Sequence, residues 1–274
     1  MIVLTGATGG IGTALALALA QRGEHLVLSA RDEARLQALA ARVREAGGTA
    51  TVHACELRDQ EAVSRMAAAI LEDGVPGAVI ALAGHSIHRG LGETFGRPHD
   101  LVRLAGTNLL GPATLILALL EPMCARGRGR VVAVTSAATR IPTPGWAAYA
   151  ATKSGLDTWL RALRPEASAR GVGICVVEMP LVATAMAAPT YGSDPRAALS
   201  PEQAAAMVLR ALDGDRSLIS PWWVRIGAVV SQAAPARSAH LAGRGGDWGA
   251  RLLRRDRPAR PSRSLRHRAA ERRS

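Results

Sequence analysis

The sequence predicts an α/β protein built on a doubly wound, mostly parallel sheet with helices on both faces. Short apolar runs, several of them rich in Val, alternate along the chain with longer stretches rich in Ala, Leu and Arg. The short runs lack strict polar alternation, which is typical of strands buried on both sides of a sheet. A glycine-rich turn joins the first run to the first long stretch. Units of this kind pack as right-handed crossovers of a parallel sheet.

Each predicted element follows from this alternation, taken in chain order. Seven short apolar runs are the expected strands: Ile2–Thr5, His25–Ser29, Thr51–Ala54, Ala78–Ala83, Arg130–Thr135, Gly173–Glu178 and Ser217–Ile219. Six longer stretches are the expected helices: Ile11–Arg22, Glu33–Glu45, Glu61–Leu71, Leu109–Arg126, Ala148–Arg170 and Pro201–Leu212. The last helix has a clear start signal, because Ser200 supplies an N-cap and Pro201 fits the first helical position.

These elements predict one Rossmann-like domain over residues 1–235 and an Arg-rich tail over residues 236–274. The chain carries a net charge of +12, and the tail accounts for +9 of it, with twelve Arg against three acidic residues. Arg, Ser, Pro and Gly dominate the tail, so we expect it to be largely disordered. The tail has one Trp and no nucleic-acid-reading motif, and we therefore expect no specific nucleic-acid partner.

The three cysteines, Cys55, Cys124 and Cys175, are odd in number and far apart. They predict neither a disulfide framework nor a metal site, which favours a reducing compartment. The N-terminal residues lack the basic start and long apolar run of a signal peptide. The most apolar stretch, residues 109–120, is too short to span a bilayer. We therefore expect a cytoplasmic protein.

The segment TGATGGIG, residues 5–12, connects the first expected strand to the first expected helix. Glycine there lets the backbone turn tightly and approach a pyrophosphate, and the amides at the helix start then face the anion. Because the segment follows the first strand of an alternating chain, it favours dinucleotide binding over an ordinary turn. The candidate cofactor contacts in it are Gly6, Thr8, Gly10, Ile11 and Gly12.

The end of the second strand bears on the choice of cofactor. A free ribose 2′-OH favours a carboxylate at this strand end. Here the strand ends in small residues followed by Arg31, whose guanidinium could hold a 2′-phosphate. Asp32 comes next, and it either caps the following helix or reaches the ribose. The sequence therefore predicts NADP(H) in preference to NAD(H), with NAD(H) kept as the alternative.

Three polar side chains fall at spacings that suit acid–base chemistry. Ser136 closes the fifth expected strand, Tyr149 follows thirteen residues later, and Lys153 four residues after that. On a helix, Tyr149 and Lys153 lie on one face, one turn apart. Ser136 stands at the carboxyl end of its strand, where open α/β sheets bind ligands. Lys153 is the only lysine among the chain's 34 basic residues.

With these motifs the chain resembles the short-chain dehydrogenase/reductase family over roughly residues 1–220. TGATGGIG is similar to the family's TGxxxGIG, and YAATK at residues 149–153 is similar to its Tyr-x-x-x-Lys helix. TNLLG at residues 107–111 matches the segment that bears the family's catalytic Asn, here Asn108. Ala83 and Gly84 match the Ala-Gly that lies beside the cofactor. The short length and the Asn108 segment favour the single-domain branch.

The resemblance implies an NAD(P)(H)-dependent oxidoreductase that transfers a hydride between a nicotinamide and a carbonyl/alcohol pair. Tyr149 would be the general acid/base, and Lys153 would lower its pKa and hold the nicotinamide ribose. Ser136 would hydrogen-bond the substrate oxygen as charge develops. Asn108 would position a water that connects Lys153 to solvent.

Several positions depart from the family pattern. Leu82 replaces an Asn that ties neighbouring strands together. Glu56, followed by Leu57, replaces the usual Asp beside the adenine ring, and both residues are candidate cofactor contacts. After the sixth strand, Pro180 is a candidate cofactor contact, but it is not followed by the Gly that the family usually has there. Thr184 is the candidate for contact with the nicotinamide carboxamide. These departures bear on cofactor handling and leave the three acid–base candidates untouched.

The loop after the sixth strand, residues 185–199, is expected to close over the substrate as a lid. Met186, Tyr191 and the region Ile141–Trp146 are candidate pocket walls, which suggests a fairly apolar carbonyl or alcohol substrate. Ordinary surface packing explains these side chains equally well. In relatives, the helices equivalent to Leu109–Arg126 and to the one beginning near Ala148 pack across a dimer interface. A homodimer or homotetramer is therefore expected.

Trp222 and Trp223 stand beside Arg225 at the start of an apolar run. Such a run could lie in a membrane interface, wall the substrate pocket or pack on the domain, and we favour the last two. Two alternatives to the oxidoreductase stay open: a catalytically weak or inactive dinucleotide-binding sensor or scaffold, and a membrane-surface lipid reductase. The intact acid–base set favours the enzyme, because a binding protein needs no proton donor beside the nicotinamide.

Overall fold

The computed structural model describes residues 1–191, 198–234 and 237. Its centre is a seven-stranded sheet in the order β3-β2-β1-β4-β5-β6-β7, in which all neighbours are parallel. The strands are β1 Ile2–Thr5, β2 His25–Ala30, β3 Thr49–Ala54, β4 Ala78–Ala81, β5 Gly129–Ser136, β6 Val172–Met179 and β7 Leu218–Ile219. The strand order reverses between β1 and β4, which is where such sheets open a ligand crevice. The predicted doubly wound α/β fold is confirmed.

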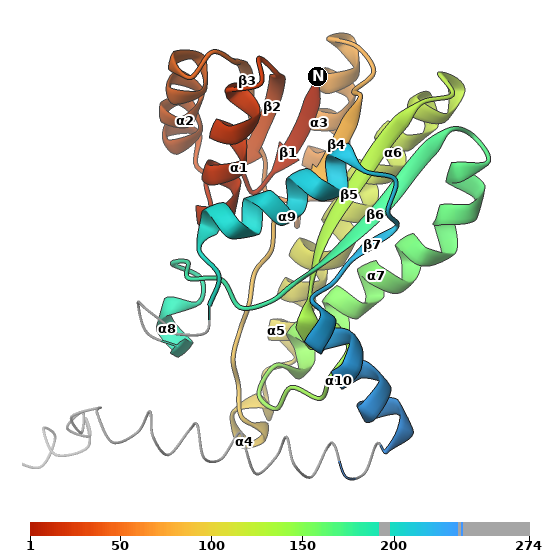
Figure 1. Ribbon diagram of the computed structural model, residues 1–274. Helices are drawn as coiled ribbons and strands as arrows, with labels where there is room; N and C mark the ends of the chain where they lie inside the picture. The colour runs from red at the N-terminus through yellow and green to blue at the C-terminus, as the bar shows by residue number, and fades with distance from the viewer. Residues whose placement is uncertain (192–197, 235–236, 238–274) are drawn as a thin grey trace, which may run out of the picture.

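The main helices cover both faces of the sheet (Figure 1). One face carries α1 Gly10–Ala20, α2 Glu33–Glu45 and α9 Pro201–Asp213, with α1 packed between the other two. The opposite face carries α3 Gln60–Glu72, α6 Gly111–Ala125 and α7 Ala147–Ser168. The predicted start of α9 is confirmed, because the Ser200 hydroxyl accepts a hydrogen bond from the amide of Gln203 at 3.2 Å.

Two apolar cores lie on either side of the sheet. Alternate strand side chains point to opposite faces. Leu4 of β1 therefore joins a core with Leu15 of α1, whereas its neighbour Val3 joins a second core with Leu115 of α6. Burial on both faces is the reason why the strands appear in the sequence as unbroken apolar runs.

The helix predicted at Leu109–Arg126 is the second half of a longer one. Helix α5, Pro98–Ala105, continues into α6 through a π-helical turn at Gly106–Leu110. The continuous run of 28 residues is long and apolar enough to cross a membrane by length and composition, which corrects the expectation based on the shorter stretch. Its inner side is packed within the protein, however, with Leu115, Ile116 and Leu119 fully buried. This packing is that of a core helix.

Several short elements were not predicted. They are α4 Leu91–Thr94, α5, the 3-10 turn η2 Ala137–Thr139, α8 Ala188–Tyr191 and α10 Trp222–Ala233. Strand β4 also ends at Ala81 rather than Ala83. Helix α10 combines a buried Val224 with exposed apolar side chains such as Trp222 and Ile226, so its apolar residues do not mark a single buried face. Helices α4, α5, α8 and α10 gather at the end of the sheet where the strands terminate (Figure 1). Apart from Arg237, the predicted tail lies outside the described residues.

Candidate active site

The glycine turn between β1 and α1 lies against the loop that follows β4. Gly6 has φ of +68°, in the left-handed region that favours glycine. A Cβ on Gly6 would lie 2.8 Å from the Cα of Ala83, and one on Gly12 would lie 2.2 Å from the carbonyl oxygen of Gly6. Both positions therefore require glycine. No side chain caps α1 at Gly9, so the start of the helix offers its amides to an anion.

Lys153 meets the loop after β4 and the end of β5. A Cβ on Gly84 would lie 3.2 Å from the Nζ of Lys153 and 3.5 Å from the Oδ1 of Asn108. The ammonium of Lys153 donates a hydrogen bond to the carbonyl oxygen of Val134 at 2.9 Å. Ser136 ends the same strand two residues later. The structure thus brings these candidates together at the carboxyl ends of β4 and β5.

Asn108 is fully buried in the π-helical turn. Its Oδ1 accepts a hydrogen bond from the amide of His85 at 2.8 Å. Its Nδ2 donates to the carbonyl oxygen of His85 at 2.9 Å and to the Oγ1 of Thr152 at 3.1 Å. These contacts join the loop after β4 to α7, next to Lys153. Both amide protons are used, so an expected relay water could bind only an oxygen of Asn108.

Burial controls the titration of the acid–base candidates. Burial lowers the pKa of Lys153 to about 8, because apolar surroundings disfavour the charged form. Burial raises the pKa of Tyr149, and a hydrogen bond with the Ser136 side chain acts in the opposite direction. The pKa of Tyr149 is therefore raised in this structure, opposite to the expected lowering, because burial is the largest effect. Tyr149 keeps its proton at neutral pH.

Trp146 is the centre of an aromatic cluster beside Tyr149. Its ring stacks on Tyr191 of α8 with centroids 6.1 Å apart and planes 4° apart. It meets Tyr149 edge-on at 5.7 Å and His88 edge-on at 5.1 Å. Two of the predicted wall residues thus form an aromatic wall next to the phenol, whereas Met186 is 48% exposed.

Thr184 lies against the glycine turn. A Cβ on Gly10 would lie 3.1 Å from the Cγ2 of Thr184. The segment after Pro180 therefore reaches the turn without the glycine that usually follows the proline. Ile11 turns toward the core on the α1 side of the sheet instead, where it packs as a partly buried side chain.

The predicted 2′-phosphate region contains two arginines. Arg31 follows β2 with its side chain 74% exposed. Asp32 caps α2, since its Oδ1 accepts a hydrogen bond from the amide of Arg35 at 3.0 Å. Of the two interpretations of Asp32, the cap is confirmed. Arg35, which no sequence motif marks, donates from Nη2 to the carbonyl oxygen of Thr8 at 2.8 Å.

Glu56 and Leu57 are already engaged within the protein. The Glu56 carboxylate accepts hydrogen bonds from the Nη2 of Arg58 at 2.9 Å and from the Arg58 amide at 3.1 Å. The side-chain hydrogen bond to Arg58 lowers the pKa of Glu56. Leu57 is buried, and a Cβ on Gly111 would lie 2.7 Å from its Cβ. A cofactor could therefore meet Leu57 only through its main chain.

Thr5 supplies the hydrogen bonding that Leu82 cannot provide. The Oγ1 of Thr5 accepts hydrogen bonds from the amides of Leu82 and Ala83, each at 3.2 Å. A hydroxyl on β1 thus ties the end of β4 to its neighbour, in place of an amide side chain on β4.

A buried ion-pair cluster fastens the loop after Ser136. The guanidinium of Arg140 contacts the Oδ2 of Asp157 at 3.2 Å and is also bound to Glu178 at the end of β6. Arg161 approaches the same oxygen of Asp157 at 3.3 Å. Asp157 lies on α7, one turn beyond Lys153. These residues are far apart in the chain and belong to no motif, so the sequence alone does not mark them.

Comparison with known proteins agrees with this geometry. The family profile described as short chain dehydrogenase matches residues 1–194. The chain belongs to the short-chain dehydrogenase/reductase family. This dehydrogenase/reductase is 33% identical over 235 residues to a fatty acyl-CoA reductase from Acinetobacter baylyi, covering 85% of this chain and 79% of the relative. It is 36% identical over 219 residues to a fatty acyl-CoA reductase from Mycobacterium tuberculosis, covering 77% and 72% of the two chains.

A solved structure gives the same assignment. The dehydrogenase/reductase matches a metagenomic short-chain oxidoreductase in complex with NADP, with a TM-score of 0.69 and 31% identity over 80% of this chain and 94% of the other. The protein is therefore a nicotinamide-dependent oxidoreductase of a family that binds NAD or NADP. Across residues 1–191 and 198–234, no group of three or more His, Cys, Asp and Glu side chains is placed to hold a metal ion.

The structure gathers most of the predicted site residues at the ends of β1, β4, β5 and β6. Those that lie in contact with one another or in adjoining turns are Gly6, Gly10, Gly12, Ala83, Gly84, Asn108, Ser136, Tyr149, Lys153, Pro180 and Thr184. Glu56 and Leu57 are held by other parts of the protein. Trp146 was predicted only as part of a substrate-pocket wall. Its ring contact with Tyr149 could not be predicted from the spacing of the two residues in the sequence.

Proposed function

We propose that this protein is an NADP(H)-preferring reductase of a carbonyl group on an apolar chain, with Tyr149 as the general acid. The observation that carries the proposal is the meeting of Ser136 and Tyr149 near the buried Lys153, beside a turn in which Gly6 and Gly12 leave no room for a Cβ. A proton donor, a second hydrogen-bond donor and a cation at one strand end are what carbonyl reduction needs.

The side chains divide the work of reduction among them. When bound, the nicotinamide supplies the hydride that adds to the carbonyl carbon. Tyr149 holds its proton at neutral pH, because burial raises its pKa, and donates it to the carbonyl oxygen. The Oγ of Ser136 accepts from the amide of Ala138 at 3.2 Å, and its own proton, which is shared with Tyr149 in this structure, would be donated to the same carbonyl oxygen when substrate binds. Lys153 stabilises the phenolate that remains.

The cofactor would be held by residues that follow the carboxyl ends of the strands. The uncapped start of α1 and the glycines before it would hold the pyrophosphate. Lys153 would hold the nicotinamide ribose, and Thr184 would meet the carboxamide. Arg31, with Arg35 nearby, supports a 2′-phosphate. Asp32 is used as a helix cap, which supports NADP(H) over NAD(H).

The substrate class is inferred from the wall and from the relatives. The aromatic cluster around Trp146 presents apolar surface next to Tyr149. Two relatives, 33% and 36% identical, carry the name fatty acyl-CoA reductase. We infer a long-chain acyl thioester or fatty aldehyde as substrate. One hydride and one proton convert a thioester into a hemithioacetal, which then releases the thiol and leaves the aldehyde.

NADPH oxidation tests this function. Hexadecanoyl-CoA, hexadecanal and short-chain aldehydes and ketones are offered to the wild type, to Tyr149→Phe and to Tyr191→Phe. Tyr149→Phe is expected to lose at least ~100-fold in turnover with unchanged NADPH affinity, whereas Tyr191→Phe, which keeps the ring on Trp146, stays active. Retained activity of Tyr149→Phe would refute the proposed role.

The main competitor is a cofactor-binding sensor or scaffold without catalysis. It predicts tight NADPH binding and no turnover of any carbonyl, with Tyr149→Phe indistinguishable from the wild type. The expected homo-oligomer and the cytoplasmic location stay predictions, and sedimentation velocity tests the first of them.

A further inference from the structure

Helix α10 presents apolar side chains on two opposite faces. On the inner face, Val224 is fully buried, and a Cβ on Gly227 would lie 3.1 Å from the Cγ2 of Ile141. The outer face carries large apolar side chains that are between 44% and 73% exposed: Trp222, Trp223, Ile226, Val229 and Val230. A helix on the surface of a globular domain normally carries polar residues there. The outer face of α10 is therefore suited to contact with another apolar surface.

Other exposed apolar side chains lie at the same end of the molecule. Leu91 and Phe95, at α4, are 76% and 71% exposed, and Met186 before α8 is 48% exposed. Helices α4, α8 and α10 all stand at the end of the sheet where the strands terminate, which is also the end that carries the candidate active site (Figure 1). These side chains come from distant parts of the sequence, so one extended apolar surface could contact several of them at once.

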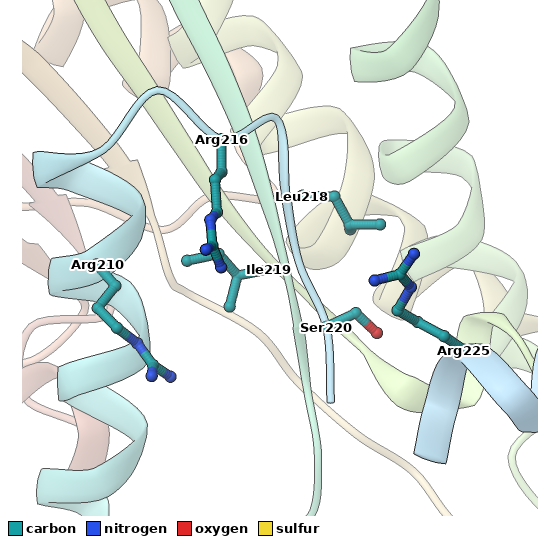
Figure 2. Close-up of a pocket in the computed structure, with 6 residues that line it drawn as sticks. All are labelled: Arg210, Arg216, Leu218, Ile219, Ser220 and Arg225. Carbon is teal, nitrogen blue, oxygen red and sulfur yellow. The ribbon is translucent and has the colours of Figure 1, made fainter. Parts of the chain in front are cut away.

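A cationic hollow adjoins α10. It encloses about 200 Å³ between α9, the edge strand β7 and α10, and its charged lining consists of Arg210, Arg216 and Arg225. Figure 2 shows the side chain of Arg225 leaving α10 toward Ser220 on the hollow side. Within the part of the chain that the structure describes, none of the three arginines forms an ion pair with a carboxylate. Three unpaired guanidinium groups at one hollow suit phosphate oxygens.

We propose that the outer face of α10 and this hollow together bind the surface of an anionic lipid bilayer. Paired tryptophans beside an arginine are typical of helices that lie at the boundary between headgroups and acyl chains. The arginines of the hollow would meet lipid phosphates. The sequence after residue 235 adds twelve Arg against three acidic residues, which further favours a negatively charged surface. A second copy of this chain would bring the same positive charges toward one another, which opposes self-association through this face.

Lipid binding would place the end of the protein that carries the candidate active site where long-chain carbonyl compounds dissolve. This consequence rests on the proposed function, whereas the binding itself does not. Vesicle binding is therefore measured without cofactor or substrate, so that its failure and a failure of the carbonyl chemistry are separate results.

Co-sedimentation with vesicles tests the proposal on the full chain. Vesicles of phosphatidylcholine alone are compared with vesicles that also contain phosphatidylglycerol. The wild type is expected to bind the anionic vesicles at least ~10-fold more tightly than the neutral ones. Trp222→Ser combined with Ile226→Ser is expected to lose at least ~10-fold of this affinity. Leu117→Ser, which removes a side chain 52% exposed on α6, is the matched control and should bind like the wild type.

Charge variants test the hollow separately. Arg225→Glu is expected to weaken binding to anionic vesicles, whereas Arg42→Glu, an exposed arginine of α2, is expected to change it little. Unchanged vesicle binding of the α10 double variant would overturn the proposal, because the arginines after residue 235 would then suffice. A different combined result would also overturn it: a wild type that dimerises without vesicles together with a double variant that is monomeric. The outer face of α10 would then be the contact with a second copy of this chain.

Discussion

Replacement of the single lysine is expected to stabilise the protein while removing its function. The pKa of Lys153 falls from 10.5 to about 8 on burial, which corresponds to about 3 kcal/mol against the charged form at neutral pH. Lys153→Met keeps the length of the side chain and removes this cost. The buried carbonyl oxygen of Val134 loses a hydrogen bond from a charged donor in the variant, which costs about 2 kcal/mol. The net expectation is a gain of about 1 kcal/mol at pH 7.

The pH dependence carries a definite sign. The pKa of Lys153 is lower in the folded protein than in the unfolded chain, so the unfolded chain binds more protons between pH 8 and 10.5. Wild-type stability therefore gains from Lys153 as the pH rises through this window. The advantage of Lys153→Met is full below about pH 8 and disappears toward about pH 10.5. No other lysine titrates there, because the chain has only this one.

Urea unfolding without cofactor, followed by far-ultraviolet circular dichroism from pH 7 to pH 10, measures the effect. Arg42→Met, which removes an exposed cation, is the control and should change the free energy of unfolding by less than about 0.5 kcal/mol. A Lys153→Met protein less stable than the wild type at pH 7 would refute the reasoning. So would a stability difference that stays constant between pH 8 and pH 10.

Three further results are expected. Arg140→Ala should destabilise the fold by about 3–5 kcal/mol in urea unfolding, because it leaves Glu178 buried without its cation and leaves Asp157 with Arg161 alone. A loss no larger than that of Arg161→Ala, removed from the exposed side of the same cluster, would contradict this. Arg31→Ala should raise the KM for NADPH at least ~10-fold and leave that for NADH nearly unchanged; equal losses would disprove the 2′-phosphate role. The kcat/KM for reduction should fall as pH rises through about 8, because Lys153 becomes neutral while Tyr149 stays protonated; a profile that stays flat well above pH 8 would argue against it.

The fold was predictable because its strands are buried on both faces. Val3 and Leu4 are adjacent in β1 and belong to different cores. Because both faces of such a strand are buried, its sequence is a continuous apolar run. Helix α10 was not predictable in the same way. Its large apolar side chains do not share one buried face, since Val224 is buried whereas Trp222 and Ile226 are exposed, so the apolar run could not be assigned to a helix that packs on the sheet. Helix α5 was not predicted because Gly106 and Thr107 interrupt the apolar pattern. In the structure a π-helical turn at these residues joins α5 to α6 without a break.

The candidate site was predictable where backbone geometry sets residue identity. Gly6 and Gly12 leave no room for a Cβ, and the spacing of Tyr149 and Lys153 follows the helical turn. Contacts between distant segments left no such mark. The cap role of Asp32 was one of two interpretations, and only the hydrogen bond from Arg35 decides it. The pKa of Tyr149 depends on how deeply the phenol is buried, which no motif records.

Deuterium transfer tests the central claim most directly. NADPH in which both hydrogens at C4 of the nicotinamide are replaced by deuterium is incubated with hexadecanal and the full-length protein, and the alcohol is analysed by mass spectrometry. The wild type is expected to place one deuterium on the former carbonyl carbon, and Tyr149→Phe is expected to yield almost no product while still binding NADPH. Alcohol without deuterium, or equal product from Tyr149→Phe, would contradict reduction with Tyr149 as the proton donor.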